Sequence, residues 1–372
     1  MLRGVALGRL GQASGADEAL LTARAFSICG GDQVLEAEVD FYAALDAFGA
    51  GRLGDARRAL ERSLDRAQAR GATELGHMPL THVIARGREL LGVIDAADGR
   101  YRDQMAHARA ALALWDASDT KDVWQEAFAI ANLAGLARDF DLEAEALSLE
   151  HRISSLRWTS ELTHTRFRAN ESLAWCAMLR GTQLEALRRF RRMADTAAST
   201  PQRIDCSVIR AINARLIGHA TMAAEEVEHA LMLAYEVDWT TAPGDDRLTL
   251  LVLAQTAAVH TPVEARAMLD RYAKIRSSMP AVYASRLETR VRAEEAFTHG
   301  VVLRAEGQIN ASAARLEMAF TIWNEIGFEW RAARAAVELA ELDAGDVFRL
   351  AVRRELRARP DSIFAERARL VA

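Results

Sequence analysis

Apolar residues recur along the chain with the i, i+3, i+4, i+7 spacing of amphipathic helices, and a turn interrupts them about every forty residues. A small side chain follows most of these turns by five positions, and a second, usually larger apolar residue follows by nine. Successive turns lie 37 to 48 residues apart. The turn positions are Gly11, Gly51, Gly99, Asp139, Gly181, Gly218, His260 and Gly307.

Each repeat unit is best explained as two antiparallel helices joined at one of these turns. Glycine suits the turn because it accepts a positive φ and ends the first helix. No alternating run of β-branched residues indicates a strand. Self-similarity at this period is typical of stacked helical repeats, so the pattern predicts an all-α solenoid of about seven to nine antiparallel helix pairs.

The pattern predicts one domain, with a repeat array over residues 1–342 and C-terminal capping helices over residues 343–372. Trp323, Phe328 and Trp330 flank a break in the pattern near the end of the array. Either the last helices cover these aromatic rings, or the rings form an exposed docking or dimer surface.

Composition supports the all-α expectation, since alanine supplies 73 of the 372 residues and proline only six. The net charge of −5 argues against a general nucleic-acid binder, which needs a basic surface. No run of eighteen apolar residues occurs, so we expect no membrane association and a cytoplasmic protein.

The motifs of common catalytic and metal sites are absent from the sequence. There is no G-x-x-x-x-G-K-[ST], H-E-x-x-H, G-x-S-x-G or C-x-x-C motif. Asp245 and Asp246 suggest a metal site, but they precede a predicted helix, where acids interact favourably with the helix dipole. We therefore expect no cofactor, no metal and no enzyme, with an enzyme on a helical-repeat frame as the weaker alternative.

Residues 90–101 (LLGVIDAADGRY), residues 173–190 (LAWCAMLRGTQLEALRRF) and the helix pair around Gly307 resemble tetratricopeptide repeats. The usual unit has 34 residues, whereas the period here is about 42. The longer period resembles the MalT-like repeat region of large LuxR-type ATP-dependent transcriptional regulators, and residues 313–342 resemble that region's terminal repeats. The resemblance implies a right-handed solenoid that supplies only a sensor or docking part.

In tetratricopeptide-like arrays the first helix of each pair lines a concave groove. Aromatic and arginine side chains dominate binding hot spots, and such a groove can hold an extended peptide or an amphipathic helix. Ordinary packing between repeats is the alternative explanation for each of these residues. The predicted groove residues are Phe41, Tyr42, Trp124, Phe128, Phe167, Arg168, Glu171, Trp175, Arg210 and Phe297.

Two arginine clusters on predicted helices are candidate docking surfaces for an acidic partner, and solvated helix faces are the alternative. The first cluster is Arg188, Arg189, Arg191 and Arg192, and the second is Arg353, Arg354, Arg357 and Arg359.

Taken together, the sequence favours a non-catalytic scaffold that binds a protein or peptide in its groove, in bacterial signalling or transcriptional regulation. A small-molecule inducer sensor is the alternative, since MalT-like regions are associated with effector sensing. We expect no direct contact with nucleic acid.

Overall fold

The computed structural model describes most of the chain, and its contacts divide the chain into two compact units. The first unit comprises residues 1–129 and 280–288, and the second comprises residues 130–279 and 289–372. The described residues are 13–31, 33–69, 74–75, 78–119, 123–156, 162–216, 218–242, 246–278, 288–361 and 365–371.

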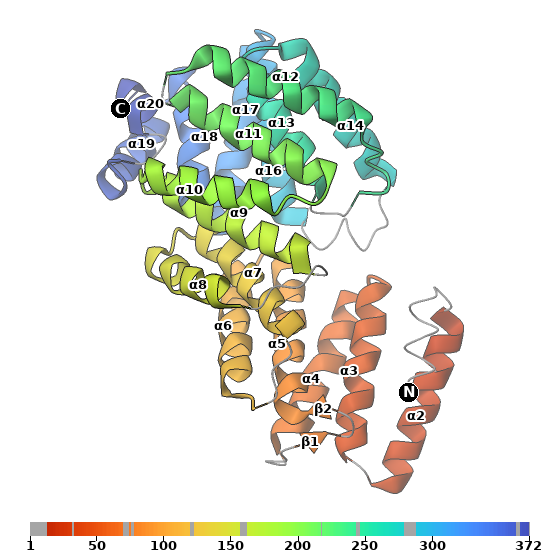
Figure 1. Cartoon of the computed structure of the whole chain (residues 1–372). Coiled ribbons are helices and arrows are strands. Elements are labelled where there is room, and N and C mark those ends of the chain that lie inside the picture. The colour runs from red at the N-terminus through yellow and green to blue at the C-terminus, as the bar shows by residue number, and fades with distance from the viewer. Residues whose placement is uncertain are drawn as a thin grey trace. The chain divides into compact units, whose positions relative to one another are not determined.

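Antiparallel helix pairs form both units (Figure 1). The first helices of the pairs are α3 (Gln33–Gly49), α5 (Leu80–Ala97), α7 (Val123–Asp139), α9 (Thr163–Leu179), α11 (Thr200–Leu216), α13 (Thr249–Ala257), α16 (Glu288–Ala305) and α18 (Glu329–Glu341). The second helices are α4 (Leu53–Ala69), α6 (Tyr101–Ala117), α8 (Glu143–Ser155), α10 (Gln183–Asp195), α12 (Ala220–Glu236), α14 (Pro262–Ser278), α17 (Ile309–Glu325) and α19 (Asp346–Ala358). Helix α2 (Ala13–Gly30) precedes these pairs and α20 (Ala365–Val371) follows them. The expected all-α solenoid of helix pairs is confirmed.

Three short elements lie in the joints between pairs. Strands β1 (Glu74–Leu75) and β2 (Met78–Pro79) form a two-residue antiparallel ladder after α4. The 3-10 turn η2 (Asp246–Leu248) leads into α13. These elements are the size of turns and leave the all-α class unchanged.

Most turns inside the pairs share one backbone conformation, and the turn at His260, which has no residue of positive φ, is an exception. At Gly99 φ is 78°, and the amides of Gly99 and Arg100 donate to the carbonyls of Ala96 and Asp95. This Schellman-type helix end needs a residue with positive φ, which glycine accepts most readily. The same sign of φ occurs at the expected turn residues Gly51, Gly181, Gly218 and Gly307.

The turn between α7 and α8 lies two residues later than the sequence pattern predicts. Asp141, and not Asp139, has the positive φ of 52°. Aspartate is one of the few non-glycine residues that tolerate this region. The shift also replaces the expected small residue Ala144, which is exposed, by Ala146, which is buried. The first predicted turn, at Gly11, lies outside the described residues.

Close approach of the two helices in a pair explains the small residues that follow the turns. Ala56, Ala186 and Ser312 are fully buried. Ser312 donates from its hydroxyl to the carbonyl of Gly300 on the neighbouring helix at 2.7 Å. A Cβ atom added to Gly300 would lie 2.6 Å from Cγ of Leu316. The helices therefore pack so closely that a methyl group at Gly300 does not fit.

The second unit closes on itself, because its last helix pair packs against its first. Trp330 at the start of α18 donates from Nε1 to the carbonyl of Arg138 near the end of α7, at 2.9 Å. The rings of Phe140 and Phe328 meet edge to face, with 5.2 Å between their centroids. Ion pairs between non-adjacent pairs, described below, join the first helices across a common interior. We call this surface, formed by α7, α9, α11, α13, α16 and α18, the inner face.

The aromatic residues at the break before α18 are covered. Trp323, Phe328 and Trp330 are all buried, and Trp323 packs on Phe297 with 5.3 Å between ring centroids. An exposed docking patch at this place is therefore excluded. The cover comes partly from α7 and its turn, and not from the C-terminal helices alone.

Candidate functional site

Ionisable side chains on the inner face of the second unit form two adjoining clusters. Charged residues are seldom buried without a specific partner, so their concentration here is a feature of the site. We call Arg168, Glu171, Asp205 and Asp246 the acidic cluster. We call Arg138, Asp139, Arg290, Glu294, Arg331 and Arg334 the basic cluster.

In the acidic cluster one guanidinium group serves three carboxyl groups from α9, α11 and η2. Arg168 Nη1 lies 2.8 Å from Glu171 Oε2 and 2.9 Å from Asp205 Oδ2. Its Nη2 pairs with Asp246 Oδ1, and Thr249 donates to Asp205 Oδ1 at 2.6 Å. Asp246 Oδ2 is buried and has no hydrogen-bond partner among the described residues. The cluster therefore holds more acid than base.

The surplus of acid changes the proton affinity of these groups. Burial raises the pKa of Asp205 to about 7, and Glu171 and Asp246 add to the rise against the opposing charge of Arg168. Burial would also raise the pKa of Glu171, but Arg168 and Arg138 hold that pKa below its ordinary value. The acidic cluster can therefore keep a proton near neutral pH or exchange it for a cationic group.

Asp139 is the centre of the basic cluster and binds arginines from three helices. Its Oδ1 lies 3.0 Å from Arg138 Nε and 2.9 Å from Arg331 Nη2, and its Oδ2 lies 3.3 Å from Arg290 Nη1. Arg331 Nη1 also lies 2.8 Å from Glu294 Oε2. Burial alone would raise the pKa of Asp139, but the three guanidinium groups hold it well below its ordinary value.

Arg334 completes the basic cluster through a neutral partner. Its Nη2 donates to Gln255 Oε1 at 2.7 Å, and its guanidinium lies 4.3 Å from the ring centroid of Phe297. Burial lowers the pKa of Arg334 to about 10, against the opposing charges of Glu294 and Glu338. Within this cluster four guanidinium groups thus face two carboxylates. Glu171 of the acidic cluster interacts with Arg138 and Arg290 and balances part of the excess, and an anionic ligand group would balance the rest.

Solvent reaches the inner face although its carboxylates are enclosed. The side chains of Arg290 and Arg168 are 27% and 20% exposed, whereas those of Asp139 and Asp246 are 2% and 1% exposed. The arginine side chains are therefore partly accessible, while the carboxylates that hold them are enclosed. Such groups can contact a ligand without losing their internal partners.

A third group of charges lies where α18 ends. Glu338 and Glu341, which we call the acidic pair, both lie 2.6 Å from Arg304 Nη1. Arg367 of α20 donates from Nη1 and Nη2 to the two oxygens of Glu338, at 2.6 and 2.7 Å, and from Nη2 to Glu341 at 2.6 Å. This forked geometry is the strongest form of arginine–carboxylate recognition.

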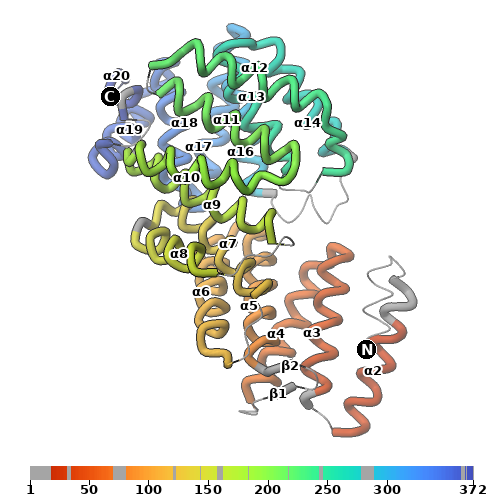
Figure 2. Tube along the Cα trace, in the orientation of Figure 1, coloured from red at the N-terminus to blue at the C-terminus, as the bar shows by residue number. Residues whose placement is uncertain are grey.

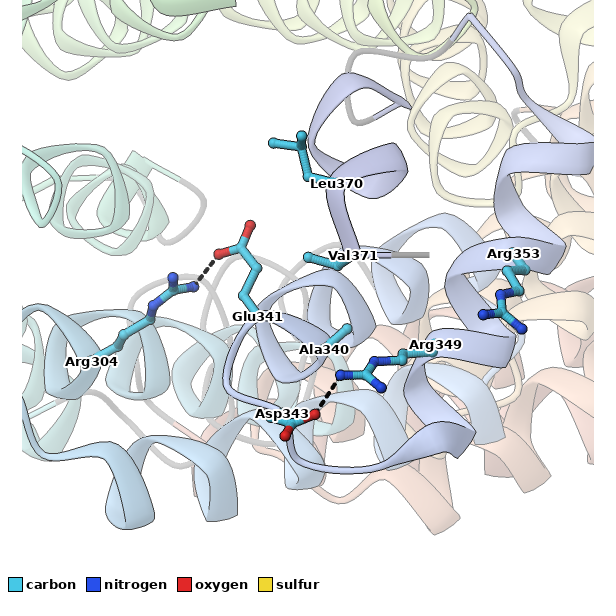
Figure 3. A pocket seen from close by; sticks show the side chains of 8 residues that line it. All are labelled: Arg304, Ala340, Glu341, Asp343, Arg349, Arg353, Leu370 and Val371. Carbon is cyan, nitrogen blue, oxygen red and sulfur yellow. Dashed lines mark hydrogen bonds and ion pairs between the residues drawn. The ribbon is translucent and has the colours of Figure 1, made fainter.

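A pocket of about 630 Å³ opens beside the acidic pair (Figure 3). In Figure 3 the Arg304 side chain points toward Glu341, and that of Arg349 points toward Asp343. Arg353 and Leu370 complete this part of the lining, so three arginines face two acids. Two acids beside the lining also pair with these arginines, Glu338 with Arg304 and Asp346 with Arg349.

The structure places three of the predicted groove residues in the core. Phe41, Phe167 and Phe297 are buried between helices, so their rings are not presented to a ligand, and these three assignments are corrected. Arg168 and Glu171, in contrast, come together on the inner face, 2.8 Å apart.

The other predicted groove residues lie at partly exposed positions. Trp124 and Phe128 stack with 5.9 Å between ring centroids and are 47% and 37% exposed. Tyr42 and Trp175 are half-buried against the cores of their units. Arg210 forms an ion pair with an acid of α12 at 2.9 Å.

The first arginine cluster is divided between surface and interior. Arg188, Arg191 and Arg192 are exposed on α10. Arg189 is buried and pairs with Glu150 at 2.5 Å, so it is not part of a docking surface, and this assignment is corrected.

In the second arginine cluster, Arg353, Arg354 and Arg357 lie exposed on α19. Arg359 instead pairs with Asp141 in the turn between α7 and α8.

Sequence reasoning missed Asp246, which it explained as an acid at a helix start. The neighbouring Asp245 lies outside the described residues. Asp246 does precede α13, but its buried side chain pairs with Arg168, which is 78 positions away. The missed signal is the period itself. Arg168, Asp205 and Asp246 are 37 and 41 positions apart, which places them at equivalent positions of successive repeats.

A separate polar cluster in the first unit surrounds Asp95. Arg57 and Arg100 lie 2.6 and 2.5 Å from Asp95 Oδ1, and His107 Nε2 lies 3.3 Å from Oδ2. These residues and Asp103 line a pocket of about 390 Å³. Burial lowers the pKa of His107, against the opposing charge of Asp95. Both oxygens of Asp95 are therefore already engaged.

Neither metal nor membrane features emerge from the part of the chain that the structure describes. It contains no group of three or more histidine, cysteine, aspartate or glutamate side chains arranged to hold a metal ion. None of its helices combines the length and apolar character needed to cross a membrane.

No protein-family model matches the chain, and no curated protein matches it either. Among solved structures, the chain is similar to a Rap protein complexed with competence and sporulation factor. The two share 12% sequence identity over 91% of this chain and 97% of that chain, with a TM-score of 0.48. A likeness this distant carries no argument about ligands, so the function has to be argued from the charges of the inner face.

Proposed function

We propose that this chain is a non-catalytic repeat scaffold that binds a protein or peptide segment on the inner face of its second unit. The observation that carries the proposal is the mismatch of charge between adjoining clusters, with surplus acid around Arg168 and surplus base around Asp139. Burying unmatched charges costs stability, and apolar side chains would pack the same space at lower cost. A retained mismatch therefore favours a ligand that completes it.

The two clusters define the chemistry of that ligand. The uncompensated oxygen of Asp246 favours a cationic or hydrogen-donating group. Arg290 and Arg334, which reach solvent, favour a carboxylate. A peptide segment that carries both charges within a few residues would satisfy both clusters. The MalT-like resemblance of the sequence supports a place for such binding in bacterial signalling or transcriptional regulation.

Peptide display against the purified chain tests this proposal. Captured peptides are expected to carry both an acidic and a basic residue. Asp246→Asn and Arg334→Gln are each expected to weaken their binding at least about tenfold, since a charged hydrogen bond contributes roughly 1.5–3 kcal/mol. Arg188→Gln is the matched control, because Arg188 is exposed on α10.

Two results would contradict the proposal. One is a set of captured peptides whose binding is weakened by Arg188→Gln but not by Asp246→Asn or Arg334→Gln. The other is failure of the folded chain to select any peptide, with circular dichroism showing that all variants keep their helix content.

The pocket in Figure 3 favours a second candidate function, a sensor for an anionic small molecule. Arg304, Arg349 and Arg353 supply three guanidinium groups against two acids there. A thermal-shift screen of phosphorylated and carboxylated metabolites tests this candidate, because a ligand of the folded state raises the melting temperature. An Arg349→Gln variant should lose the shift, and Arg188→Gln should keep it.

The pocket of the first unit, where a histidine contacts an acid, is the place at which catalysis would be expected. His107 and Asp95 meet there, but Asp95 is shared with two arginines, so it cannot also act as a free base. The lining residues include no serine, threonine or cysteine nucleophile among those described.

A further inference from the structure

Residues 359–361 and helix α20 contact the second unit at separate places. Arg359 pairs with Asp141 in the α7–α8 turn, and the backbone carbonyl of Asp361 lies against Gly181 in the α9–α10 turn. A Cβ atom at Gly181 would overlap that carbonyl. Helix α20 packs on α18. Figure 2 shows α19 and α20 near the C-terminal end of the trace, in the same unit as α18.

Helix α20 is held on the second unit by small buried residues and by the forked hydrogen bonds of one arginine, and we call this contact surface the α20 seat. Ala365 and Ala368 are buried against the unit, whereas Leu370 is 83% exposed. Arg367 reaches both members of the acidic pair with four hydrogen bonds, three of which are 2.6–2.7 Å long, and the fourth joins its Nε to Glu341. A seven-residue helix has little stability of its own, so its position depends on these contacts.

Two further arginines, Arg215 and Arg304, add positive charge around the Arg367 guanidinium. Arg215, in the last turn of α11, has a pKa lowered by burial and by the positive charge of Arg367. Arg304 already binds both glutamates of the acidic pair. The face of α18 thus has a well-formed guanidinium site, held by a short helix that brings little apolar surface.

We propose that this face of α18 is a binding site for an arginine-bearing helical segment of a partner protein, and that α20 occupies it in the partner's absence. The partner segment would present an arginine to Glu338 and Glu341, with small residues two before it and one after it, as Ala365 and Ala368 stand to Arg367. The proposal deepens the proposed function, since it rests on peptide binding by the second unit and names one element of the partner.

The test uses the full chain and a fluorescent peptide with the sequence of residues 360–372. In an Arg367→Glu variant the acidic pair repels α20 and is left open. We expect the peptide to bind this variant at least tenfold more tightly than it binds the wild-type chain. Arg369→Glu is the matched control, because it makes the same charge change on the exposed side of α20, where Arg369 donates to the carbonyl of Pro360. A peptide with glutamate at position 367 should not bind either variant.

Hydrogen exchange supplies a second readout. Amides of residues 365–371 should exchange at least tenfold faster in Arg367→Glu than in Arg369→Glu. Equal exchange in the two variants, equal binding of both peptides, or no binding to a folded Arg367→Glu chain would each overturn the proposal.

Should Arg367→Glu fail to fold, Gly181→Ala replaces it, with Gly218→Ala as its control. Gly181 and Gly218 have φ of 73° and 81°, so alanine strains both backbones similarly, but only the methyl group added at position 181 collides with Asp361. Amide hydrogen exchange in α20 should become faster in Gly181→Ala but not in Gly218→Ala. An equal increase in both variants would contradict the proposal that α20 occupies a binding site on α18.

The outcomes remain distinct from those of the peptide-display experiment. Failure of the 360–372 peptide leaves binding at the acidic and basic clusters untouched, because Asp246 and Arg334 are not part of the α20 seat. Failure of display, in turn, leaves the exchange measurement on α20 unchanged.

Discussion

The indole nitrogen of Trp330 donates a hydrogen bond to the backbone carbonyl of Arg138, across 192 positions of sequence. The bond joins the last and first helix pairs of the second unit. Trp330→Phe should keep an aromatic ring but leave a buried carbonyl without a donor, which costs about 1–3 kcal/mol. Urea unfolding should show this loss in free energy of unfolding.

Trp115→Phe is the control for that substitution. Trp115 donates to Glu89 in the first unit at 3.1 Å, so its loss should leave hydrogen exchange at the end of α7 unchanged. Trp330→Phe should accelerate exchange there. Equal exchange in both variants would mean that this bond does not hold the unit closed.

Asp139→Asn tests the centre of the basic cluster. The substitution leaves the buried guanidinium groups of Arg138 and Arg331, and the partly exposed one of Arg290, without their shared charge, and breaking a buried ion pair in this way costs about 3–5 kcal/mol. Asp98→Asn should cost less than about 1 kcal/mol, because Asp98 forms its ion pairs at the exposed surface. Chemical denaturation compares the two, and similar losses would contradict this account of Asp139.

Asp205 should make stability depend on pH near neutrality. Its pKa is about 7 in the folded chain and about 3.9 for an ordinary aspartate, so the folded state binds more protons between these values. The free energy of unfolding should therefore fall as pH rises through this window, by up to about 1.4 kcal/mol per pH unit.

Asp205→Asn removes this contribution. Relative to wild type, the variant should gain stability as pH rises from 5 to 7, as measured by thermal unfolding at each pH. Glu171→Gln supplies the opposite sign, because the folded pKa of Glu171 is lowered and its contribution is lost on acidification. Parallel pH profiles of wild type and Asp205→Asn would contradict the assignment.

Two glycine positions in helices should respond in opposite directions to alanine. Gly300→Ala forces a methyl group to 2.6 Å from Leu316 and should destabilise by about 1–3 kcal/mol. Gly135→Ala has only the Ser172 hydroxyl at 4.0 Å and should stabilise α7 by about 0.5–1 kcal/mol. Melting temperatures that shift in the same direction would disprove the close packing at Gly300.

The helix pairs and most of their turns were predictable, because turn glycines and apolar spacing are local signals. Only some of the predicted groove residues lie on the inner face, since neighbouring residues of a helix point about 100° apart. Phe167 faces the core, while Arg168 and Glu171, three positions apart, share the inner face. The closure of the second unit was not predictable, because the contact of Trp330 with Arg138 leaves no local pattern.

That closure also limits how this unit can evolve. In an open array each repeat touches only its neighbours, so gene duplication or deletion can change the number of copies at little cost. Here a gained or lost copy would separate Trp330 from Arg138 and leave Asp139 without Arg331. Change in the second unit is therefore expected to proceed by substitution within a constant number of repeats.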